Sequence, residues 1–353
     1  MKPKPVRAVV GGGDAVGRDR KAEHIRLALE KRMQLDANYF EDWYFEHRAL
    51  PEIDFADIDT SVAFLGKTLS APLLISCMTG GTDEATRINR NLAAAAEETG
   101  IAVGVGSQRK VFESPETAES FRIRPQAPSV PVLANLGAVQ LNYGFGIEEC
   151  RRAVEMIGAD ALVFHLNALQ EAIQPEGQRN FSGLLDKMGA VAAALDVPVI
   201  VKEIGCGISA SVARELMQRG IRIIDTAGVG GTSWARIEGQ RAEDLELGDR
   251  FADWGIPTPL AIRQLSSIAG LTVIGSGGVR NGIDAAKAVA LGSDVVGMAY
   301  PFLKAADDSP EAVSDKIRRT VLEMKICMFC VGARTTRELQ QVEVRRRSSE
   351  GME

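Results

Sequence analysis

Residues 161–171 read Ala161-Leu-Val-Phe-His165-Leu-Asn-Ala-Leu-Gln-Glu171. The four apolar residues at the start are typical of a strand that is buried on both faces. An imidazole, two amides and a carboxylate follow, and each buried polar group without a partner costs roughly 1–3 kcal/mol. These groups therefore fit the open end of a strand, where they face a ligand. Taken alone, this stretch also allows an ordinary transition from strand to loop.

The same apolar-then-polar pattern recurs along the chain. Eight short, β-branched runs alternate with stretches that have helical spacing. The runs cover residues 72–76, 102–107, 132–137, 161–166, 199–204, 223–228, 272–278 and 295–300. Helices are expected at residues 85–98, 148–157, 184–195, 210–219, 259–269, 284–291 and 310–325.

This alternation predicts the α/β class with a parallel sheet. Eight units within about 250 residues have the size of a closed (β/α)8 TIM barrel. An open, doubly wound sheet is the alternative, but it usually has fewer strands and a nucleotide fingerprint after the first one. We expect one barrel domain over residues 20–340, a flexible extension at 1–19 and a disordered basic tail at 341–353.

Composition limits the classes of function. The 353 residues carry a net charge of −6, which argues against a general nucleic-acid binder. No apolar run reaches the roughly 18 residues of a membrane span, and the basic N-terminus lacks the apolar core of a signal peptide. We therefore expect a cytoplasmic protein.

Cys327 and Cys330 form a C-x-x-C pair. A zinc site would need a second pair, and a redox motif would lie between a strand and the start of a helix. Neither context surrounds them, and residues 324–331 have the pattern of an apolar helix. The pair is interpreted as part of that helix. Cys77, Cys150 and Cys206 are interpreted as ordinary reduced thiols.

In a barrel of this kind, chemistry lies where the strands end. The predicted strand ends carry Met78-Thr-Gly-Gly, Ser107-Gln-Arg, Asn135, His165-Leu-Asn, Lys202-Glu, Gly228-Val-Gly-Gly-Thr-Ser, Gly277-Gly-Val-Arg and Ala299-Tyr. Amides, hydroxyls and glycines predominate, whereas solvated loops would favour Lys, Glu and Asp. This pattern predicts a bound ligand that has polar edges and a phosphate.

Three of these ends suggest specific chemistry. Gly277-Gly-Val-Arg-Asn-Gly precedes the helix at Asp284, and such turns can bind phosphate through backbone N–H groups; a plain tight turn is the alternative. A lysine at Lys202 is costly to bury unless it meets an anion, and the N1–C2=O edge of a flavin is one suitable partner. Residues 229–258 form an insertion after strand six, either a lid or a partner surface, whose charge run from 238 to 253 is interpreted as a solvated face.

Arg20, Lys21 and His24 cluster at the start of the first expected helix. A solvated cationic face is the simpler interpretation. The alternative is an arm that delivers cations to an anionic ligand.

Taken together, the motifs resemble one family, the type 2 isopentenyl-diphosphate delta-isomerases. The similar segments are Arg20-Lys-Ala-Glu-His, Met78-Thr-Gly-Gly, Val105-Gly-Ser-Gln-Arg, Asn135-Leu-Gly-Ala, His165-Leu-Asn-Ala-Leu-Gln-Glu, Gln174-Pro-Glu-Gly-Gln-Arg-Asn-Phe, Val201-Lys-Glu-Ile-Gly, Gly230-Gly-Thr-Ser-Trp and Gly277-Gly-Val-Arg-Asn-Gly. Other flavin barrels share the glycine-rich turn but not the His-x-Asn-x-x-Gln-Glu segment.

The resemblance implies a homo-oligomer, a tetramer or octamer, that interconverts isopentenyl and dimethylallyl diphosphate. It implies FMN, reduced by NADPH and acting as acid and base without net redox change, and Mg²⁺ beside the diphosphate. The implied FMN contacts are Met78, Thr79, Gly80, Ser107, Asn135, Lys202, Thr232, Gly278, Arg280, Ala299 and Tyr300. The implied substrate contacts are Arg20, Lys21, Ser107, Gln108, Arg109, His165 and Gln170. Glu171 would face Mg²⁺, partly through water, and Gln170 and His165 would be catalytic.

Elementary chemistry agrees with this set. A diphosphate needs cations and a hard metal with an oxygen ligand. Protonating an alkene gives a carbocation-like species, which an amide-rich rim would not trap. Two rivals remain: an FMN-dependent hydroxy-acid oxidase, and a silent flavin- or phosphate-binding barrel that acts as a sensor. The oxidase needs a late histidine, yet no histidine follows His165.

Overall fold

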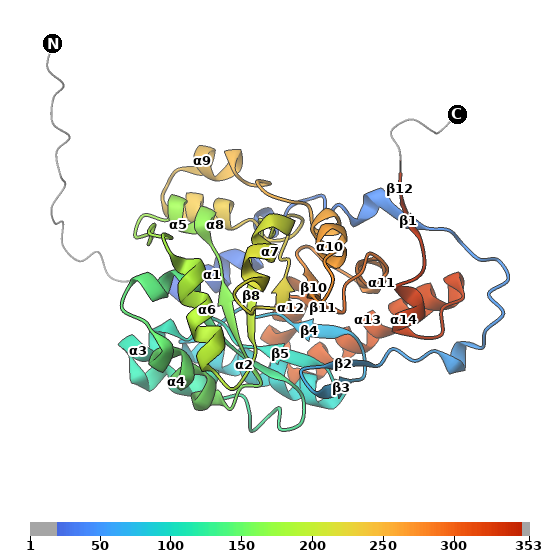
Figure 1. The fold of residues 1–353 in the computed structure, drawn as a ribbon, viewed down its shortest axis with the longest axis horizontal. Coiled ribbons are helices and arrows are strands. Elements are labelled where there is room, and N and C mark those ends of the chain that lie inside the picture. Colours follow the sequence, from blue (N-terminus) through green and yellow to red (C-terminus); the bar gives the residue numbers. More distant parts are fainter. Residues whose placement is uncertain (1–19, 348–353) are drawn as a thin grey trace, which may run out of the picture.

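The computed structural model describes residues 20–347. Eight parallel strands close into a barrel in the order β10-β11-β4-β5-β6-β7-β8-β9 (Figure 1). Because the last strand of this order, β9, also pairs with the first, β10, the sheet is closed, which confirms the (β/α)8 barrel and excludes the open sheet. The strands are β4 (Leu73–Ile75), β5 (Ala102–Gly104), β6 (Val132–Gly137), β7 (Ala161–His165), β8 (Val199–Lys202), β9 (Ile223–Asp225), β10 (Thr272–Ser276) and β11 (Val295–Met298).

Helices surround this barrel. They are α1 (Arg20–Leu29), α2 (Asp83–Thr99), α3 (Arg109–Glu113), α4 (Ile147–Ile157), α5 (Ala168–Ile173), α6 (Leu184–Ala194), α7 (Ala210–Met217), α8 (Trp234–Arg241), α9 (Leu245–Arg250), α10 (Thr258–Ser266), α11 (Gly282–Ala290), α12 (Tyr300–Asp308), α13 (Pro310–Val331) and α14 (Thr336–Leu339). Short 3₁₀ turns are η1 (Lys31–Met33), η2 (Phe40–Asp42), η3 (Phe55–Asp57), η4 (Pro115–Phe121) and η5 (Ala138–Asn142).

Local signals explain where the longest helix lies. Pro310 occupies its first turn, where a missing N–H is harmless, and Gly332 ends it with a φ of 74°. Cys327 and Cys330 both lie inside this helix, α13, which confirms the helical interpretation of that segment.

The barrel has an apolar interior that is closed at one end. Its buried residues include Leu74, Leu133, Ile200 and Ile274, and the hairpin β2 (Val62–Phe64) and β3 (Lys67–Leu69) adds Phe64 and Leu69 to the same cluster. Several contributing residues begin their strands, so the hairpin seals the N-terminal end, here called the bottom. The opposite end, here called the mouth, holds the strand termini that the sequence marks as polar.

The C-terminal segment departs from the expectation of a disordered tail. Residues Val344–Arg346 form β12, which pairs antiparallel with β1 (Trp43–Phe45). The N–H of Arg347 also donates to the carbonyl of Asp42. Backbone pairing orders a stretch that composition alone describes as polar and basic. Residues 1–19 and 348–353, which complete the predicted extension and tail, lie outside the described part of the chain.

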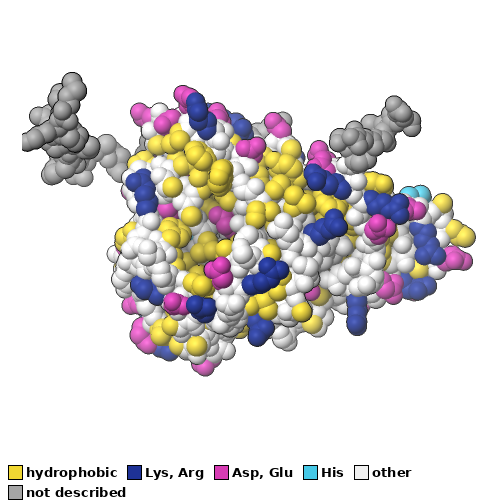
Figure 2. All heavy atoms as spheres, turned by 45° about the horizontal axis from the view of Figure 1, so that its top comes forward, with side chains coloured by type: hydrophobic (Ala, Val, Ile, Leu, Met, Phe, Trp, Pro, Cys, Tyr) yellow, Lys and Arg dark blue, Asp and Glu magenta, His cyan; other side chains and the backbone are white. Residues whose placement is uncertain are grey.

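The insertion after strand six folds into α8 and α9, which lie over the mouth (Figure 1). Basic and acidic side chains are interspersed on the face seen in Figure 2. Glu238 departs from the expected solvated face, because its side chain is 0% exposed. Within residues 20–347, no helix is both long and apolar enough to cross a membrane.

Candidate active site

A cavity of about 1440 Å³ opens at the mouth of the barrel. Its lining includes the residues predicted to hold FMN, namely Met78, Thr79, Gly80, Ser107, Asn135, Lys202, Thr232, Gly278, Arg280, Ala299 and Tyr300. Arg109, His165, Gln170 and Glu171 line it as well. The strand ends that the sequence marks as polar therefore converge on one space, although they are spread over more than 200 residues of chain.

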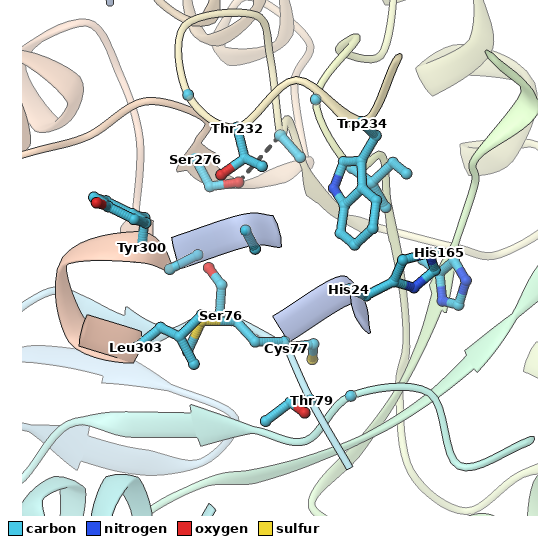
Figure 3. A pocket seen from close by; sticks show the side chains of 18 of the residues that line it. His24, Ser76, Cys77, Thr79, His165, Thr232, Trp234, Ser276, Tyr300 and Leu303 are labelled. Atoms are coloured by element: carbon cyan, nitrogen blue, oxygen red, sulfur yellow. Dashed lines mark hydrogen bonds between the residues drawn. The ribbon is translucent and has the colours of Figure 1, made fainter. Parts of the chain in front are cut away.

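Side chains enter this space from opposite sides. Figure 3 shows Thr232, Ser276 and Tyr300 on one side and His24, Trp234 and His165 on the other. The rings of His24 and Trp234 meet edge to face at 5.3 Å between centroids. The cavity can hold two ligands that lie against each other, one on each wall.

One wall forms a phosphate cradle. Gly278 has a φ of 71°, and a Cβ there would lie 2.2 Å from the carbonyl oxygen of Gly230. Only glycine allows the two glycine-rich loops to pack backbone against backbone. Ala299 precedes α12 without a side-chain cap, Pro301 has no N–H, and Phe302 N donates to the carbonyl of Ala299, so Tyr300 is the first-turn residue whose N–H can meet an anion.

The N-terminus of α11 departs in part from the sequence expectation, because three N–H groups at this helix start are already used by the protein. Arg280 N donates to Asp284 Oδ2, Gly282 N to Glu323 Oε2 and Asp284 N to Asn281 Oδ1, at 2.8–3.0 Å. The open helix end beside the glycine turn is that of α12, which follows strand eight.

Arg280 lines the cavity and also holds the N-terminal segment in place through hydrogen bonds. Its guanidinium donates to the carbonyls of Leu35 at 2.5 Å, Asp36 at 2.9 Å and Gly230 at 3.3 Å. Gln34 lies in the same N-terminal segment, and its Nε2 donates a hydrogen bond to Oγ1 of Thr232 at 2.8 Å. The segment before β1 is thereby tied across the glycine-rich loops.

Lys202 lies at the floor of the cavity, and its side chain is buried. Its ammonium donates to the carbonyl of Glu203, and strand register places it opposite both His165 and Asp225. Burial raises the pKa of Asp225, and Lys202 and Ser276 partly offset the rise. Burial likewise raises the pKa of the Cys77 thiol to about 12, so this cavity residue stays protonated at neutral pH.

Three observations test whether FMN fits. The cradle of Gly278 and α12 suits its phosphate, Lys202 suits the N1–C2=O edge, and Ser76 presents a buried Oγ that has no partner among the described residues. The donor set and the size of the cavity therefore fit FMN.

His165 is held in a defined orientation. Its Nδ1 lies 3.0 Å from Oδ1 of Asn135, and because that oxygen can only accept, Nδ1 carries the proton.

The structure corrects the prediction that Gln108 contacts substrate. Gln108 is 0% exposed, its Nε2 donates to Ala153 O and its Oε1 accepts from Asn135 N. Its neighbour Arg109 reaches the cavity instead.

A buried polar chain extends from β7 towards α8. Helices α8 and α9 are here called the lid for their position over the mouth. Asn167 Nδ2 donates to Gln170 Oε1 at 3.0 Å and to Glu171 Oε1 at 2.9 Å. Gln170 Nε2 donates to Glu238 Oε1 at 2.7 Å. His24 Nε2 lies 3.0 Å from the same oxygen. Both amides of the opening stretch are thus engaged, and the chain ends on a carboxylate of α8.

The sequence predicts no site role for two residues of this hydrogen-bonded chain, Asn167 and Glu238. Asn167 belongs to the stretch quoted first, and its buried Oδ1 has no partner within residues 20–347. Glu238 was hidden inside an acidic run, and no local signal separates it from its neighbours. Burial raises the pKa of Glu238, but the contacts with His24, Gln170 and Arg241 outweigh this and leave it below the usual value.

The arm residues are described only in part. Arg20 and Lys21 belong to the first turn of α1, but their side chains lie outside the described residues. His24 and Ile25 of the same helix line the cavity. The helix that carries the predicted cations therefore lies at the mouth.

The family described as FMN-dependent dehydrogenase matches residues 22–123 and 151–346. Solved structures of mandelate oxidase variants share the fold, with TM-scores of 0.60 and 0.61 at 18% identity; one covers 92% of this chain and 92% of its own, the other 92% and 90%. Fold and site define an FMN-binding barrel of the FMN-dependent dehydrogenase family.

Curated relatives narrow the class. An isopentenyl-diphosphate delta-isomerase of Nostoc sp. is 51% identical over 319 residues, covering 89% of this chain and 91% of that protein. One from Paracoccus zeaxanthinifaciens is 51% identical and covers 91% and 95%; one from Rickettsia bellii is 46% identical and covers 92% and 97%. The chain belongs to the isopentenyl-diphosphate delta-isomerase family, in its FMN-dependent type 2 form, which confirms the resemblance.

Proposed function

We propose that this protein interconverts isopentenyl diphosphate and dimethylallyl diphosphate by a 1,3-allylic proton shift. The single observation that carries the proposal is the Asn167–Gln170–Glu238 chain, which faces the same cavity as a cradle suited to FMN. When bound and reduced, FMN supplies an acid–base at N5 without net redox change. NADPH is the proposed reductant.

The wall opposite the cradle is proposed to bind the diphosphate. Arg109, His165 and Ser107 contribute from the strand ends, and Arg20 and Lys21 from α1. Arg109 already bonds Glu113 at 2.7 Å and Gln178 at 3.2 Å, which hold its guanidinium at the rim. Charge-assisted bonds to phosphate would exchange with these.

Mg²⁺ is proposed to meet the diphosphate beside Glu171. This carboxylate is 7% exposed and accepts from Asn167 Nδ2 and from the N–H of Gln178. Within residues 20–347, no three His, Cys, Asp or Glu side chains cluster as a metal site. The ion would therefore complete its shell with phosphate oxygens and water, as Mg²⁺ commonly does.

Gln170 is proposed to face the reacting allyl unit. An amide is a poor acid and a poor base, but its Nε2 donates to Glu238, whose lowered pKa leaves it ionised and able to accept a proton. Gln170 can therefore orient the alkene or relay a proton to Glu238. The amides around it are weak nucleophiles, which suits a carbocation-like species.

The structural likeness to mandelate oxidases raises the oxidase rival again. The three histidines of this chain are His24, His47 and His165, so none lies in the late barrel. Gln170 and Glu171 also have no role in a silent sensor barrel. Both observations favour the isomerase.

The test is an anaerobic assay with FMN, NADPH, Mg²⁺ and isopentenyl diphosphate, with each component omitted in turn. We expect dimethylallyl diphosphate only when the flavin is reduced and Mg²⁺ is present. A protein whose flavin is reduced without any isomerisation would contradict the proposal. Oxidation of a 2-hydroxy acid in a parallel assay would establish the oxidase rival.

We also propose a homo-oligomer, a tetramer or octamer. Ile283 on α11 and Leu322 and Ile326 on α13 are 41–48% exposed, a set of apolar side chains that an interface would cover. Light scattering at assay concentration tests this, and a monomeric mass would contradict it.

A further inference from the structure

Arg241, the last residue of α8, joins three elements that are distant in sequence. Its Nη1 donates to Glu238 Oε2 at 2.6 Å, its Nη2 to Glu176 Oε1 at 2.8 Å and its Nε to Glu23 Oε2 at 3.3 Å. Glu238 belongs to α8, Glu23 to α1 and Glu176 to the loop between α5 and α6. One guanidinium therefore links the lid, the arm and the loop that follows Glu171.

The burial of this cluster separates it from the other ion pairs of the lid. The Arg241 side chain is 11% exposed and that of Glu238 is 0% exposed, whereas Arg250 and Glu246 on α9 are 70% and 77% exposed. Surface pairs contribute little to stability, and a buried pair must first offset its desolvation. Stability alone is thus a weak reason for the buried Arg241–Glu238 pair, whose further partners Glu23 and Glu176 are 23% and 44% exposed, and a positional role accounts for it better.

The geometry at Glu238 shows what is positioned. Arg241 binds Oε2, which leaves Oε1 directed at Gln170 Nε2 and His24 Nε2. A carboxylate bound at one oxygen by a fixed guanidinium cannot rotate freely, so Gln170 is held in one orientation. The contact with Glu23 fixes α1 through the same side chain.

We propose that Arg241 is a positioning residue that couples the docking of α1 over the mouth to the orientation of Gln170 through Glu238. This inference rests on the proposed function for its catalytic consequence, but the docking of α1 is independent of it. The arm carrying Arg20 and Lys21 and the amide that faces the allyl unit are then set by one side chain.

Removing Arg241 should affect both ends of this link. Arg241→Gln should lower kcat and raise KM for isopentenyl diphosphate, with kcat/KM falling roughly tenfold to hundredfold, because small misplacements of reacting groups have effects of this size. Arg241→Lys keeps the charge, but its compact ammonium lacks the planar guanidinium that reaches three separated carboxylates, so it should show the KM effect as well.

The pH profile separates a positional role from a merely structural one. The groups in contact with Glu238 are His24 from α1, Gln170 from α5 and Arg241 from its own helix. Glu23 from α1 and Glu176 from the loop contact Arg241, and Trp234 contacts His24. Arg241 helps to keep the pKa of Glu238 low, so its loss raises that pKa. The acid limb of kcat should move to higher pH in Arg241→Gln and stay near wild type in Arg241→Lys.

A second experiment needs neither substrate nor cofactor. Hydrogen exchange on the apoprotein should show amides of residues 23–29 exchanging roughly tenfold faster in Arg241→Gln than in wild type. Glu23→Gln should reproduce this exchange effect without the shift in pH profile, and it covers the case in which Arg241→Gln fails to fold. Arg250→Gln, which removes an exposed pair on α9, serves as the matched control and should change neither readout.

The outcomes are distinguishable. A wild-type protein that does not isomerise contradicts the proposed function but leaves the exchange result to decide the docking of α1. Active wild type together with unchanged exchange and unchanged pH profiles in Arg241→Gln overturns this inference. Faster exchange of α1 in Glu23→Gln, with the pH profile moved only in Arg241→Gln, supports it.

Discussion

Asp160 at the bottom of the barrel and the buried acids Asp225 and Glu203 at its mouth behave in opposite ways. Asp160 is partly buried, but three donors from Val132, Arg124 and Lys67 surround it and its pKa is lowered. Burial raises the pKa values of Asp225 and Glu203, although Glu203 accepts three backbone N–H groups. Ionised Asp160 therefore stabilises the fold, whereas ionised Asp225 and Glu203 destabilise it; Asp294 at the bottom, with a raised pKa, and Glu238 at the mouth, with a lowered one, do not follow this contrast.

The difference shows where the fold tolerates strain. The bottom is an apolar plug with satisfied charges, so its residues contribute mainly to folding. The mouth holds a buried lysine, raised pKa values and unpartnered Ser76 and Asn167 oxygens, features that are typical of functional sites. Variants at the mouth should therefore change chemistry or ligand binding, and variants at the bottom should change stability.

The largest expected effect lies at the mouth. Gln170→Leu keeps the size of the side chain but removes the donor to Glu238 and the group that faces the allyl unit. We expect kcat to fall by about a hundredfold to ten-thousandfold, the usual range for a lost acid–base group. Isomerase kinetics measure this. Gln218→Leu, at the exposed end of α7, is the control; equal loss in both would contradict the role of Gln170.

The next effect lies at the bottom. Phe64→Ala removes a ring that is 5% exposed and packs with the interior of the barrel. A cavity of this kind costs about 3–5 kcal/mol in the free energy of unfolding. Denaturant unfolding of the holoenzyme measures it. At temperatures where the variant is folded, kcat should stay within about twofold of wild type, and a large loss of kcat would contradict the separation of the two ends.

These opposite ends were unequally predictable from sequence. The strands follow from local apolar runs, because burial on both faces requires them, and the glycine turns follow from local backbone geometry. The side-chain network of the mouth does not follow from local sequence. Glu238 differs from the other acids of its run through its contacts, such as the one with Gln170, which lies 68 residues earlier in the chain. Sequence order also could not show that Gln108 points to α4 while Arg109 points to the cavity.

Backbone pairing and capping set a further limit. The strand β12 forms by pairing with β1, which lies about 300 residues earlier in the chain. Composition gives no sign of this pairing. The sequence predicts a phosphate turn near Gly278, but the start of the neighbouring helix α11 is capped by Asn281 and by Glu323 of α13. Which helix N-terminus stays open depends on what packs against it, as Glu323 of α13 does here.

A pair of glycines sharpens the comparison. Gly278 at the mouth and Gly220 at the bottom both have positive φ, 71° and 84°, but a Cβ at Gly220 meets nothing within 4 Å. Gly278→Ala should weaken FMN binding by about a hundredfold, since strain and the contact with Gly230 both disturb the cradle. Gly220→Ala should cost about 1 kcal/mol of stability and leave FMN affinity unchanged. Fluorescence titration of the apoprotein with FMN measures both, and equal affinities would contradict the cradle.

The smallest expected effect concerns Asp160, which links the plug to the barrel. Its Oδ1 lies 2.9 Å from Lys67 Nζ of β3, and its Oδ2 accepts from Val132 N and Arg124 Nη2. Because its pKa in the folded state lies below the ordinary 3.8, its ionised form adds stability above that pH, and this contribution disappears as pH falls through the lower folded value. Asp160→Asn should cost about 1 kcal/mol near neutral pH, because the side chain is 22% exposed and solvent screens part of the interaction.

The measurement is the free energy of unfolding of wild type and Asp160→Asn at several pH values. The difference between them should be constant near neutrality and vanish at acid pH, since the wild-type carboxyl is then protonated as well. Asp186→Asn, which removes an acid that is 76% exposed and paired with Arg219, should show a difference near zero throughout. A difference at Asp160 that grows as the pH falls would mean that the bottom, like the mouth, holds its acids at a cost, and the contrast between the two ends would be wrong.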